Sequence, residues 1–288
     1  MIAATWLRWG ALTIVAFGVQ MPSKVRAGAW TQQDGGGYLK FSTRVVRADS
    51  FYDPEGNSTD IATFGDTAFS LYGEYGLFER LTLVGNLPVR RLTLNRQEGE
   101  LTGVELFPGD SSTALGDGEL GVRIALARLG SSVFSTQVTV GIPVGDTDQE
   151  NGLVTGDGEA DVRAEVLFGH SFSGLPIYLS ASTGYAQRFE GFSNEFRYGI
   201  EGGYRFGDWG LLVLRANGTQ SLKNIETAGG GEIEANLFAN NASFLAIGPE
   251  FNLALGRGSG ASVAVEGVVF GENVFDAPAF TFGLTWSR

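Results

Sequence analysis

The sequence predicts an all-β protein, a single closed antiparallel transmembrane β-barrel of about twelve strands, and three observations support this fold class. Apolar and polar residues alternate through most of the chain, which gives each strand one apolar and one polar face. The alternating segments are long enough to cross a bilayer. Their connections alternate between short and long, and a closed ring leaves no unpaired strand edge in lipid.

The alternation is clearest in two segments. From residue 280 to 286 (FTFGLTW) Phe, Leu and Trp fall on one face and Thr and Gly on the other, and residues 161–168 (DVRAEVLF) separate charged from apolar positions in the same way. Strands of soluble sandwiches are about 5–6 residues long. The alternating segments here run for about 10–14 residues, which suits the 9–11 residues that a tilted strand needs to cross a membrane.

We expect twelve strands, because twelve segments show the alternation, and this even number leaves both chain termini in the periplasm, as in bacterial barrels. The expected strands are residues 37–47, 63–76, 81–93, 114–128, 133–145, 157–171, 176–189, 195–206, 210–223, 242–255, 261–272 and 277–286. Short connections fall near 76–80, 129–132, 173–176, 206–210 and 256–260, and longer ones near 48–62, 94–113, 146–156, 190–194, 224–241 and 273–276. This pattern is typical of the outer membrane of Gram-negative bacteria, where we expect the chain to reside.

Residues 1–27 have the features of a secretory signal peptide. Arg8 supplies positive charge, residues 10–19 (GALTIVAFGV) form a short apolar run, and residues 25–27 (VRA) have the small-x-Ala form of a cleavage site. The alternative is a membrane helix that is retained, but ten residues rise about 15 Å, half of the hydrocarbon core. We therefore expect export through residues 1–27 and a barrel domain over residues 28–288.

The composition excludes several classes of protein. The 288 residues include no Cys, so neither a disulfide framework nor a thiolate metal site can form. There are 20 Lys and Arg against 32 Asp and Glu, a net charge of −12, which disfavours a nucleic-acid partner. The expected partners are outer-membrane lipid and lipopolysaccharide, the barrel-assembly machinery and a small-molecule solute.

One glycine pattern matches a cofactor-binding motif in residue types but not in its structural context. Gly116-x-Gly118-x-x-Gly121 matches a dinucleotide fingerprint, but an alternating strand follows it instead of the helix that binds the pyrophosphate. The Gly-Asp pair at its start recurs 40 residues later (GDGELGVR and GDGEADVR), which marks equivalent bends on successive hairpins. No cofactor is predicted.

The loop that begins at Asp146-x-Asp148-x-Glu150 resembles the start of a calcium-binding loop, but Asn151 stands where the sharp turn requires Gly. No EF-hand calcium site is predicted, and two interpretations remain open: a loose site for a divalent cation, or a solvated acidic loop.

His170 is the single histidine. A hydrolase would need it beside a nucleophile and an orienting group, so no enzyme is predicted.

Fifteen charged residues share the parity of the polar strand faces, and we expect them to line the lumen. They are Lys40, Arg44, Glu74, Arg90, Glu119, Arg123, Asp161, Arg163, Glu165, Arg197, Glu201, Arg205, Arg215, Glu250 and Glu266. They form either a polar path for solute or a mutually paired plug. If the arginines pair with acids on their own strands, little net electric field remains along the lumen.

Two tryptophans give the expected position of the membrane interface. Trp209 and Trp286 are expected at the periplasmic interface, where an amphipathic ring is stable, and two buried core tryptophans are the alternative.

Several segments resemble a known family. Ala29-Trp30-Thr31, residues 51–56 (FYDPEG), 72–83 (YGEYGLFERLTL) and 140–146 (VGIPVGD) are similar to the outer-membrane proteins of the meta-pathway of phenol degradation, over most of the expected mature chain. The resemblance implies an outer-membrane barrel distantly similar to transporters of hydrophobic compounds, and assigns no residue roles. One departure is that two residues follow Trp286, where barrels usually end on an aromatic residue.

These observations favour an outer-membrane channel or transporter for small molecules, hydrophobic or aromatic ones among them. Two alternatives remain. One is a structural or surface-interaction barrel that transports nothing, and the less favoured one is a membrane-embedded enzyme that modifies lipid.

Overall fold

The computed structural model describes residues 28–98, 105–224 and 240–288, so the expected signal peptide lies outside the described residues. The strands are β1 (Gly37–Tyr52), β2 (Ser58–Phe78), β3 (Leu81–Leu94), β4 (Gln97–Glu98), β5 (Glu105–Phe107), β6 (Asp110–Leu115), β7 (Gly118–Leu129), β8 (Ser132–Ile142), β9 (Asp161–Ser171), β10 (Ile177–Arg188), β11 (Glu195–Phe206), β12 (Gly210–Ser221), β13 (Ser243–Gly256), β14 (Ser259–Glu272), β15 (Val274–Phe275) and β16 (Ala279–Ser287). Within these ranges no helix is long and apolar enough to cross a bilayer.

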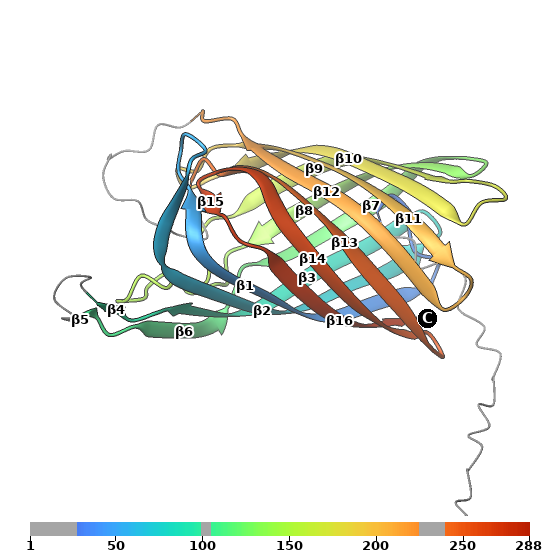
Figure 1. The fold of residues 1–288 in the computed structure, drawn as a ribbon. Helices are drawn as coiled ribbons and strands as arrows, with labels where there is room; N and C mark the ends of the chain where they lie inside the picture. The colour runs from blue at the N-terminus through green and yellow to red at the C-terminus, as the bar shows by residue number, and fades with distance from the viewer. Residues whose placement is uncertain (1–27, 99–104, 225–239) are drawn as a thin grey trace, which may run out of the picture.

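Twelve of these strands close into an antiparallel barrel, with the strands tilted against its axis (Figure 1). The closing strand is β1, which pairs with β2 on one side and with β16 on the other. Arg44, for example, lies opposite Ala68 of β2 and Thr281 of β16. Going round the ring, the remaining pairs join consecutive strands, with β7 next to β3 and β16 next to β14. The predicted all-β, closed twelve-strand fold is confirmed.

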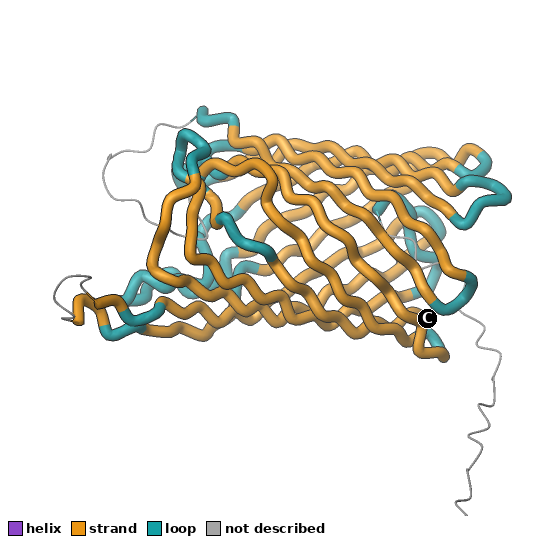
Figure 2. The backbone as a smooth tube through the Cα atoms, in the orientation of Figure 1, coloured by secondary structure: helices purple, strands orange, loops and turns teal. Residues whose placement is uncertain are grey.

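The barrel has two different ends (Figure 2). At one end, which we call the turn end, short connections such as 79–80, 130–131 and 257–258 join neighbouring strands. At the other, the loop end, the connections are longer, among them residues 143–160, 189–194 and 222–242. Residue Arg288 lies at the turn end, where its backbone N–H donates to the carbonyl of Gly37 at 2.9 Å. Parts of the expected long connections, 99–104 and 225–239, lie outside the described residues.

One expected long connection is instead mostly strand. Residues 48–62 were expected as a loop, but β1 continues to Tyr52 and β2 begins at Ser58. The turn is tight because the Asp53 carboxylate accepts the backbone N–H groups of Glu55 and Asn57 at 3.0 and 2.8 Å, and Gly56 supplies a φ of 81°. The end of β1 in this hairpin pairs with β15, where Phe51 and Tyr52 lie opposite Phe275 and Val274.

Three further expected strands have different bounds. The segment 114–128 is divided, because residues 116–117 separate β6 from β7. The segment 133–145 ends at Ile142, and the segment 157–171 begins only at Asp161. The remaining residues of these two expected strands belong to the connection 143–160. Backbone N–H groups of this connection donate to Asp117 at the loop end.

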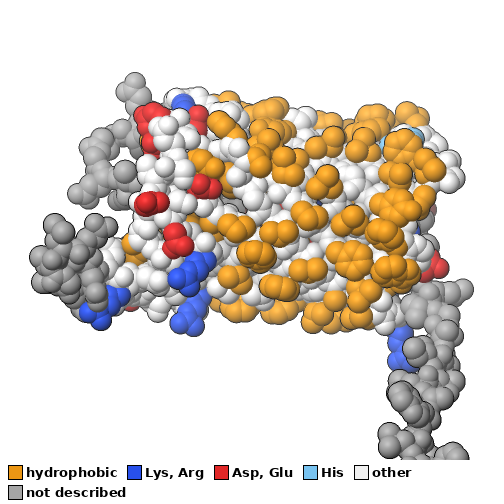
Figure 3. All heavy atoms as spheres, in the orientation of Figure 1, with side chains coloured by type: hydrophobic (Ala, Val, Ile, Leu, Met, Phe, Trp, Pro, Cys, Tyr) orange, Lys and Arg blue, Asp and Glu red, His pale blue; other side chains and the backbone are white. Residues whose placement is uncertain are grey.

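The outer surface of the barrel is apolar. Figure 3 shows apolar side chains from the middle of the barrel to the turn end, and charged ones gathered at the loop end. Val166 and Leu214 are 55% and 58% exposed, and Trp209 and Trp286, both near the turn end, are 56% and 47% exposed. Trp209 and Trp286 are therefore outward residues, not core residues. So large an apolar surface is unfavourable in water and suits contact with lipid.

The outward face of β9 supplies a stability test. Val166→Arg places a charge on the apolar surface near the middle of the strand. We expect it to lower the free energy of unfolding by about 2–4 kcal/mol, because a charge at this depth in a bilayer loses its hydration.

The comparison uses unfolding by urea in lipid vesicles, with Val166→Leu as the control at the same position. Equal stability of the two variants would contradict the assignment of this face to lipid, and would place the strand out of register by one residue.

Candidate functional site

The fifteen residues expected to line the lumen all lie on barrel strands at the parity opposite to the exposed apolar side chains, and their role in a solute path stays a prediction. The structure joins most of them in ion pairs that link neighbouring or more distant strands. Their arrangement is thus a set of local clusters around the inner wall.

The first cluster surrounds Arg215 of β12. Its guanidinium Nε lies 3.1 Å from Glu201 Oε2, and its Nη1 lies 3.0 Å from Glu250 Oε2. Glu250 also accepts from Lys40 Nζ at 2.8 Å, and the Tyr178 hydroxyl donates to Glu201 at 3.0 Å. Two acids and two bases are therefore neutralised together by groups from β1, β10, β11, β12 and β13.

The second cluster surrounds Arg123 of β7. Its Nη1 lies 3.1 Å from Glu74 Oε1 of β2, and its Nε donates to Gln137 Oε1 at 2.9 Å. The Tyr72 hydroxyl donates to the same Glu74 oxygen at 2.5 Å. The expectation that the arginines pair with acids of their own strand is wrong for Arg123, because its carboxylate partner lies on β2, beyond β3, while Glu119 of its own strand pairs with Arg163.

Elsewhere on the wall the expected same-strand acid is joined by a second acid from another strand. Arg163 of β9 contacts Glu119 of β7 at 3.2 Å and Glu165 of its own strand at 3.4 Å, with Asp161 nearby. Arg163 therefore has both a same-strand acid, as expected, and an acid from two strands away.

Asp66 organises the cluster on β1, β2 and β3. Its carboxylate is 1% exposed and lies 2.8 Å from Arg90 Nη2 and 3.7 Å from Arg44 Nη1, with Glu266 close to Arg44. The sequence reasoning missed Asp66, although it shares the parity of Glu74 on the same strand. That shared parity was the signal that could have identified it.

The segment before β1 enters the lumen. The carbonyl of Ala29 accepts from Ser135 Oγ at 2.5 Å, and the carbonyl of Trp30 accepts from Arg123 at 3.1 Å. Gln32 donates from its side chain to Glu74 at 2.6 Å. Residues 28–33 therefore reach inner-wall polar groups on β2, β7 and β8 and narrow the lumen.

Trp30 anchors this segment. It is 8% exposed, and its ring packs edge-on against Tyr178 with centroids 5.8 Å apart. A Cβ on Gly169 would lie 2.7 Å from the Trp30 ring, so the wall opposite the ring can carry only glycine without a shift. The apolar cluster around it comprises Ala29, Trp30, Ala125, Val133, Leu167, Tyr178, Leu211 and Val213. The sequence did not predict this insertion, because apolar and polar residues do not alternate in the segment.

The two Gly-Asp segments meet at the loop end. Asp117 accepts the N–H of Gly145 and the N–H of Asp157, both at 2.9 Å. A Cβ on Gly156 would lie 2.4 Å from the Asp117 carboxylate, so glycine is needed for this approach. The repeated motif therefore ties the 143–160 connection to the break between β6 and β7.

Arg188, which the sequence reasoning also missed, holds the end of the same connection. It contacts Asp157 at 3.0 Å and Glu195 at 2.9 Å, and it also pairs with Glu159. Burial raises the pKa of Glu159 to about 7, against the lowering by Arg188, and burial likewise raises the pKa of Asp157. Arg197 lies 2.8 Å from Glu195, not beside an acid of the expected set.

The connection 143–160 also packs into the barrel mouth through Leu153. This side chain is 5% exposed and belongs to an apolar cluster with inner-wall residues of β1, β2, β3 and β15. The cluster comprises Ala48, Phe51, Phe64, Leu92, Leu153 and Phe275. The lumen is thus narrowed at the loop end by a connection and at the turn end by the chain before β1.

Cavities remain beside the segment before β1. A cavity of about 210 Å³ is lined by Gly28, Tyr38, Tyr178 and Glu250, among others, and lies within the first two charged clusters. A second cavity of about 420 Å³ is lined by Trp30, Arg128 and residues of the turn end. The interior therefore offers polar chambers in which tyrosine rings and ion pairs are mixed.

His170 lies on the outward parity of β9 near the turn end, where its Nδ1 lies 2.8 Å from Ser132 Oγ. Its ring packs edge-on against Phe172 with centroids 4.7 Å apart. Neither contact is a carboxylate that would orient the ring as a general base. In the described part of the chain, no group of three or more His, Asp or Glu side chains is arranged to hold a metal ion.

The buried Arg123–Glu74 pair provides a second stability test. Both side chains are nearly inaccessible, with 5% and 7% exposed. Arg123→Met should lower the free energy of unfolding by about 3–5 kcal/mol, because it leaves a buried carboxylate without its cation.

The double variant Arg123→Met/Glu74→Gln removes both charges and should recover most of that loss when urea unfolding is measured in the same vesicles. If the double variant is as unstable as the single one, the uncompensated charge is not the cause of the loss.

No family model matches the sequence, and no curated protein matches it. The fold is similar to that of an outer-membrane channel from Pseudomonas putida F1, with a TM-score of 0.69 and 14% identity over 91% of this chain and 99% of that chain. The KdgM porin matches with a TM-score of 0.47 and 8% identity over 86% of this chain and 99% of that chain. The NanC porin matches with a TM-score of 0.49 and 6% identity over 87% and 98% of the two chains. The likeness to the Pseudomonas putida channel shows that the chain has the fold of an outer-membrane β-barrel.

Proposed function

We propose that the protein is a narrow channel for small molecules in the outer membrane of a Gram-negative bacterium, exported by a signal peptide over residues 1–27. The observation that carries this proposal is the combination of an apolar outer surface with an inner wall of charged and hydroxyl groups around cavities of about 210 and 420 Å³. Lipid is the medium that suits the outer face, and solutes dissolved in water suit the inner one.

The solute class follows from the sequence resemblance and from the wall. The resemblance to the outer-membrane family of the meta-pathway of phenol degradation supports small hydrophobic or aromatic solutes. The wall offers the rings of Tyr38, Tyr72 and Tyr178 beside charged groups, so one face of a solute can meet an aromatic ring and another a polar group. Lipopolysaccharide and the barrel-assembly machinery are the further proposed partners.

The charged groups predict weak selectivity between ions. The Arg215 and Arg123 clusters neutralise their charges within 2.8–3.1 Å, so little net field is left along the lumen. Conductance should also be low, because residues 28–33 and the connection 143–160 occupy part of the cross-section.

A structural barrel that transports nothing is the second candidate, and one observation favours it. The lumen is obstructed at both ends, by Trp30 with its neighbours and by Leu153 with its cluster. A lipid-modifying enzyme has no comparable support, since His170 is held by a serine and an aromatic ring on the outer face.

Single-channel recording in planar bilayers, with swelling of liposomes in benzyl alcohol and in small sugars, separates the two candidates. The native protein should give small current steps and admit the small solutes. Trp30→Ala/Gln32→Ala removes the ring anchor and the hydrogen bond to Glu74, and should raise the conductance several-fold.

The control is Trp209→Ala, which removes the same ring from the outer surface and should leave the conductance unchanged. A folded native protein with neither current nor uptake would overturn the channel proposal in favour of a structural barrel.

The orientation is testable because the chain contains no Cys, so a single introduced thiol reports one position. We expect Glu150→Cys, in the exposed part of the connection 143–160, to react with a membrane-impermeant maleimide on intact cells. Arg257→Cys, in the β13–β14 turn, should react only after the outer membrane is permeabilised. The reverse pattern would place the loop end in the periplasm.

A further inference from the structure

Arg205 differs from the other cations on the inner wall. In the described part of the chain, the expected lumen bases other than Arg205 each lie within 4.0 Å of a carboxylate oxygen. Arg205, near the turn end of β11, makes no such ion pair there, and its described bonds involve only the backbone. A half-buried guanidinium without an anion keeps its full charge directed into the lumen.

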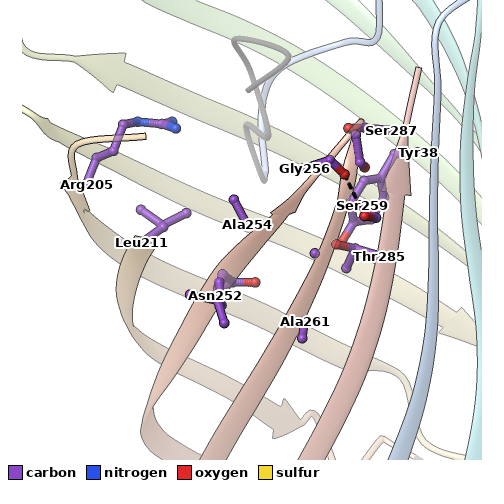
Figure 4. Close-up of a pocket in the computed structure, with 13 residues that line it drawn as sticks. Tyr38, Arg205, Leu211, Asn252, Ala254, Gly256, Ser259, Ala261, Thr285 and Ser287 are labelled. Atoms are coloured by element: carbon purple, nitrogen blue, oxygen red, sulfur yellow. Dashed lines mark hydrogen bonds between the residues drawn. The ribbon is translucent and has the colours of Figure 1, made fainter. Parts of the chain in front are cut away.

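Arg205 lines a small cavity with three further hydrogen-bonding groups, and Figure 4 shows their arrangement. The cavity, of about 60 Å³, lies against the inner wall formed by β13, β14 and β16. The Tyr38 hydroxyl, the Asn252 amide and the Thr285 hydroxyl also line it. Among the described residues, none of these three side chains forms a hydrogen bond with another residue, so their donors are free to meet a ligand.

The same cavity has an apolar side. Leu211, Ala254 and Ala261 complete its lining. Tyr38, Leu211 and Asn252 also line the cavity of about 210 Å³, so the two spaces are neighbours along the lumen. A ligand with an anionic group against Arg205 could therefore place an apolar or aromatic body in the larger space.

We propose that this pocket, defined by Arg205, Tyr38, Asn252 and Thr285, is a binding site for a small organic carboxylate on its way through the lumen. The proposal rests on the proposed channel function and narrows its solutes to amphipathic anions. A planar guanidinium offers paired N–H donors that match the two oxygens of a carboxylate, and the hydroxyl and amide groups supply further donors.

The charge of the wall supports an anion over a cation at this position. The nearest acids that line the larger cavity, Glu74 and Glu250, already pair with Arg123, Lys40 and Arg215. An organic cation would meet the uncompensated Arg205 with no free carboxylate to hold it. An organic anion would supply the counter-charge that the other lumen bases receive from the protein.

The first experiment measures binding without transport. The probe is 4-fluorobenzoate, followed by ¹⁹F NMR on the folded protein in detergent, with 4-fluorobenzyl alcohol as the neutral analogue and inorganic phosphate as the anion without an apolar body. We expect fluorobenzoate to bind more tightly than either comparison ligand. Equal binding of the alcohol would show that the carboxylate is not recognised, and equal binding of phosphate would reduce the site to a simple anion site.

Substitutions then locate the site. Arg205→Gln should weaken fluorobenzoate binding by about tenfold or more, since a charge-assisted hydrogen bond is lost, while Arg205→Lys should restore part of the affinity. Tyr38→Phe removes one oxygen and should weaken binding by about threefold. Arg257→Gln, an exposed turn residue that removes the same charge outside the pocket, is the matched control and should bind as the native protein does.

The two proposals fail in different ways. A native protein that conducts but binds fluorobenzoate equally well with and without Arg205 keeps the channel and overturns the carboxylate site. A protein that binds fluorobenzoate through Arg205 but passes no current overturns the channel alone. Should Arg205→Gln not fold, an unchanged affinity in Tyr38→Phe would overturn the site, because both groups line the same cavity.

Discussion

Closure of the sheet through β1 is the constraint on which the rest of the structure depends. Because β1 pairs with both β2 and β16, none of the twelve described barrel strands is left at an open edge of the sheet, and the backbone groups of the ring bond to one another. Closure also divides every strand into two faces with different surroundings. Apolar side chains cover the outside, and each charged residue of the opposite parity is forced into one shared interior, where it needs a partner.

The shared interior explains why the lumen is organised as clusters. Isolated charges in a narrow, partly dehydrated space are costly, so acids and bases from different strands neutralise one another, as Glu250 does with Lys40 and Arg215. The same clusters provide bonding sites for chain that is not part of the wall. Arg123 binds both Glu74 and the carbonyl of Trp30, so the ion pair that stabilises the wall also holds the segment that narrows the lumen.

Alternation in the sequence predicted the fold, the inner and outer faces, and the inward direction of the charged residues, because each of these follows from the local period of two. It could not predict which charges meet. Arg123 reaches Glu74 across β3, and that contact depends on strand order and stagger around the whole ring. Residues 28–33 and Leu153 were missed for a related reason, since they lie in segments without periodicity whose positions are set by the wall they fill. Asp66 was within reach of the parity argument and was overlooked.

Arg123 and Arg205 have the same place in the alternating pattern, but their positions in the barrel give them different partners. Both have inward parity, yet one is bonded on several sides and the other faces a small cavity without a carboxylate. Because the charges of paired residues cancel, an unpaired charge contributes more to the electrostatic attraction between the lumen and a solute. Discrimination among solutes then depends less on the total charge of the lumen than on Arg205, the lumen base that has no carboxylate partner among the described residues.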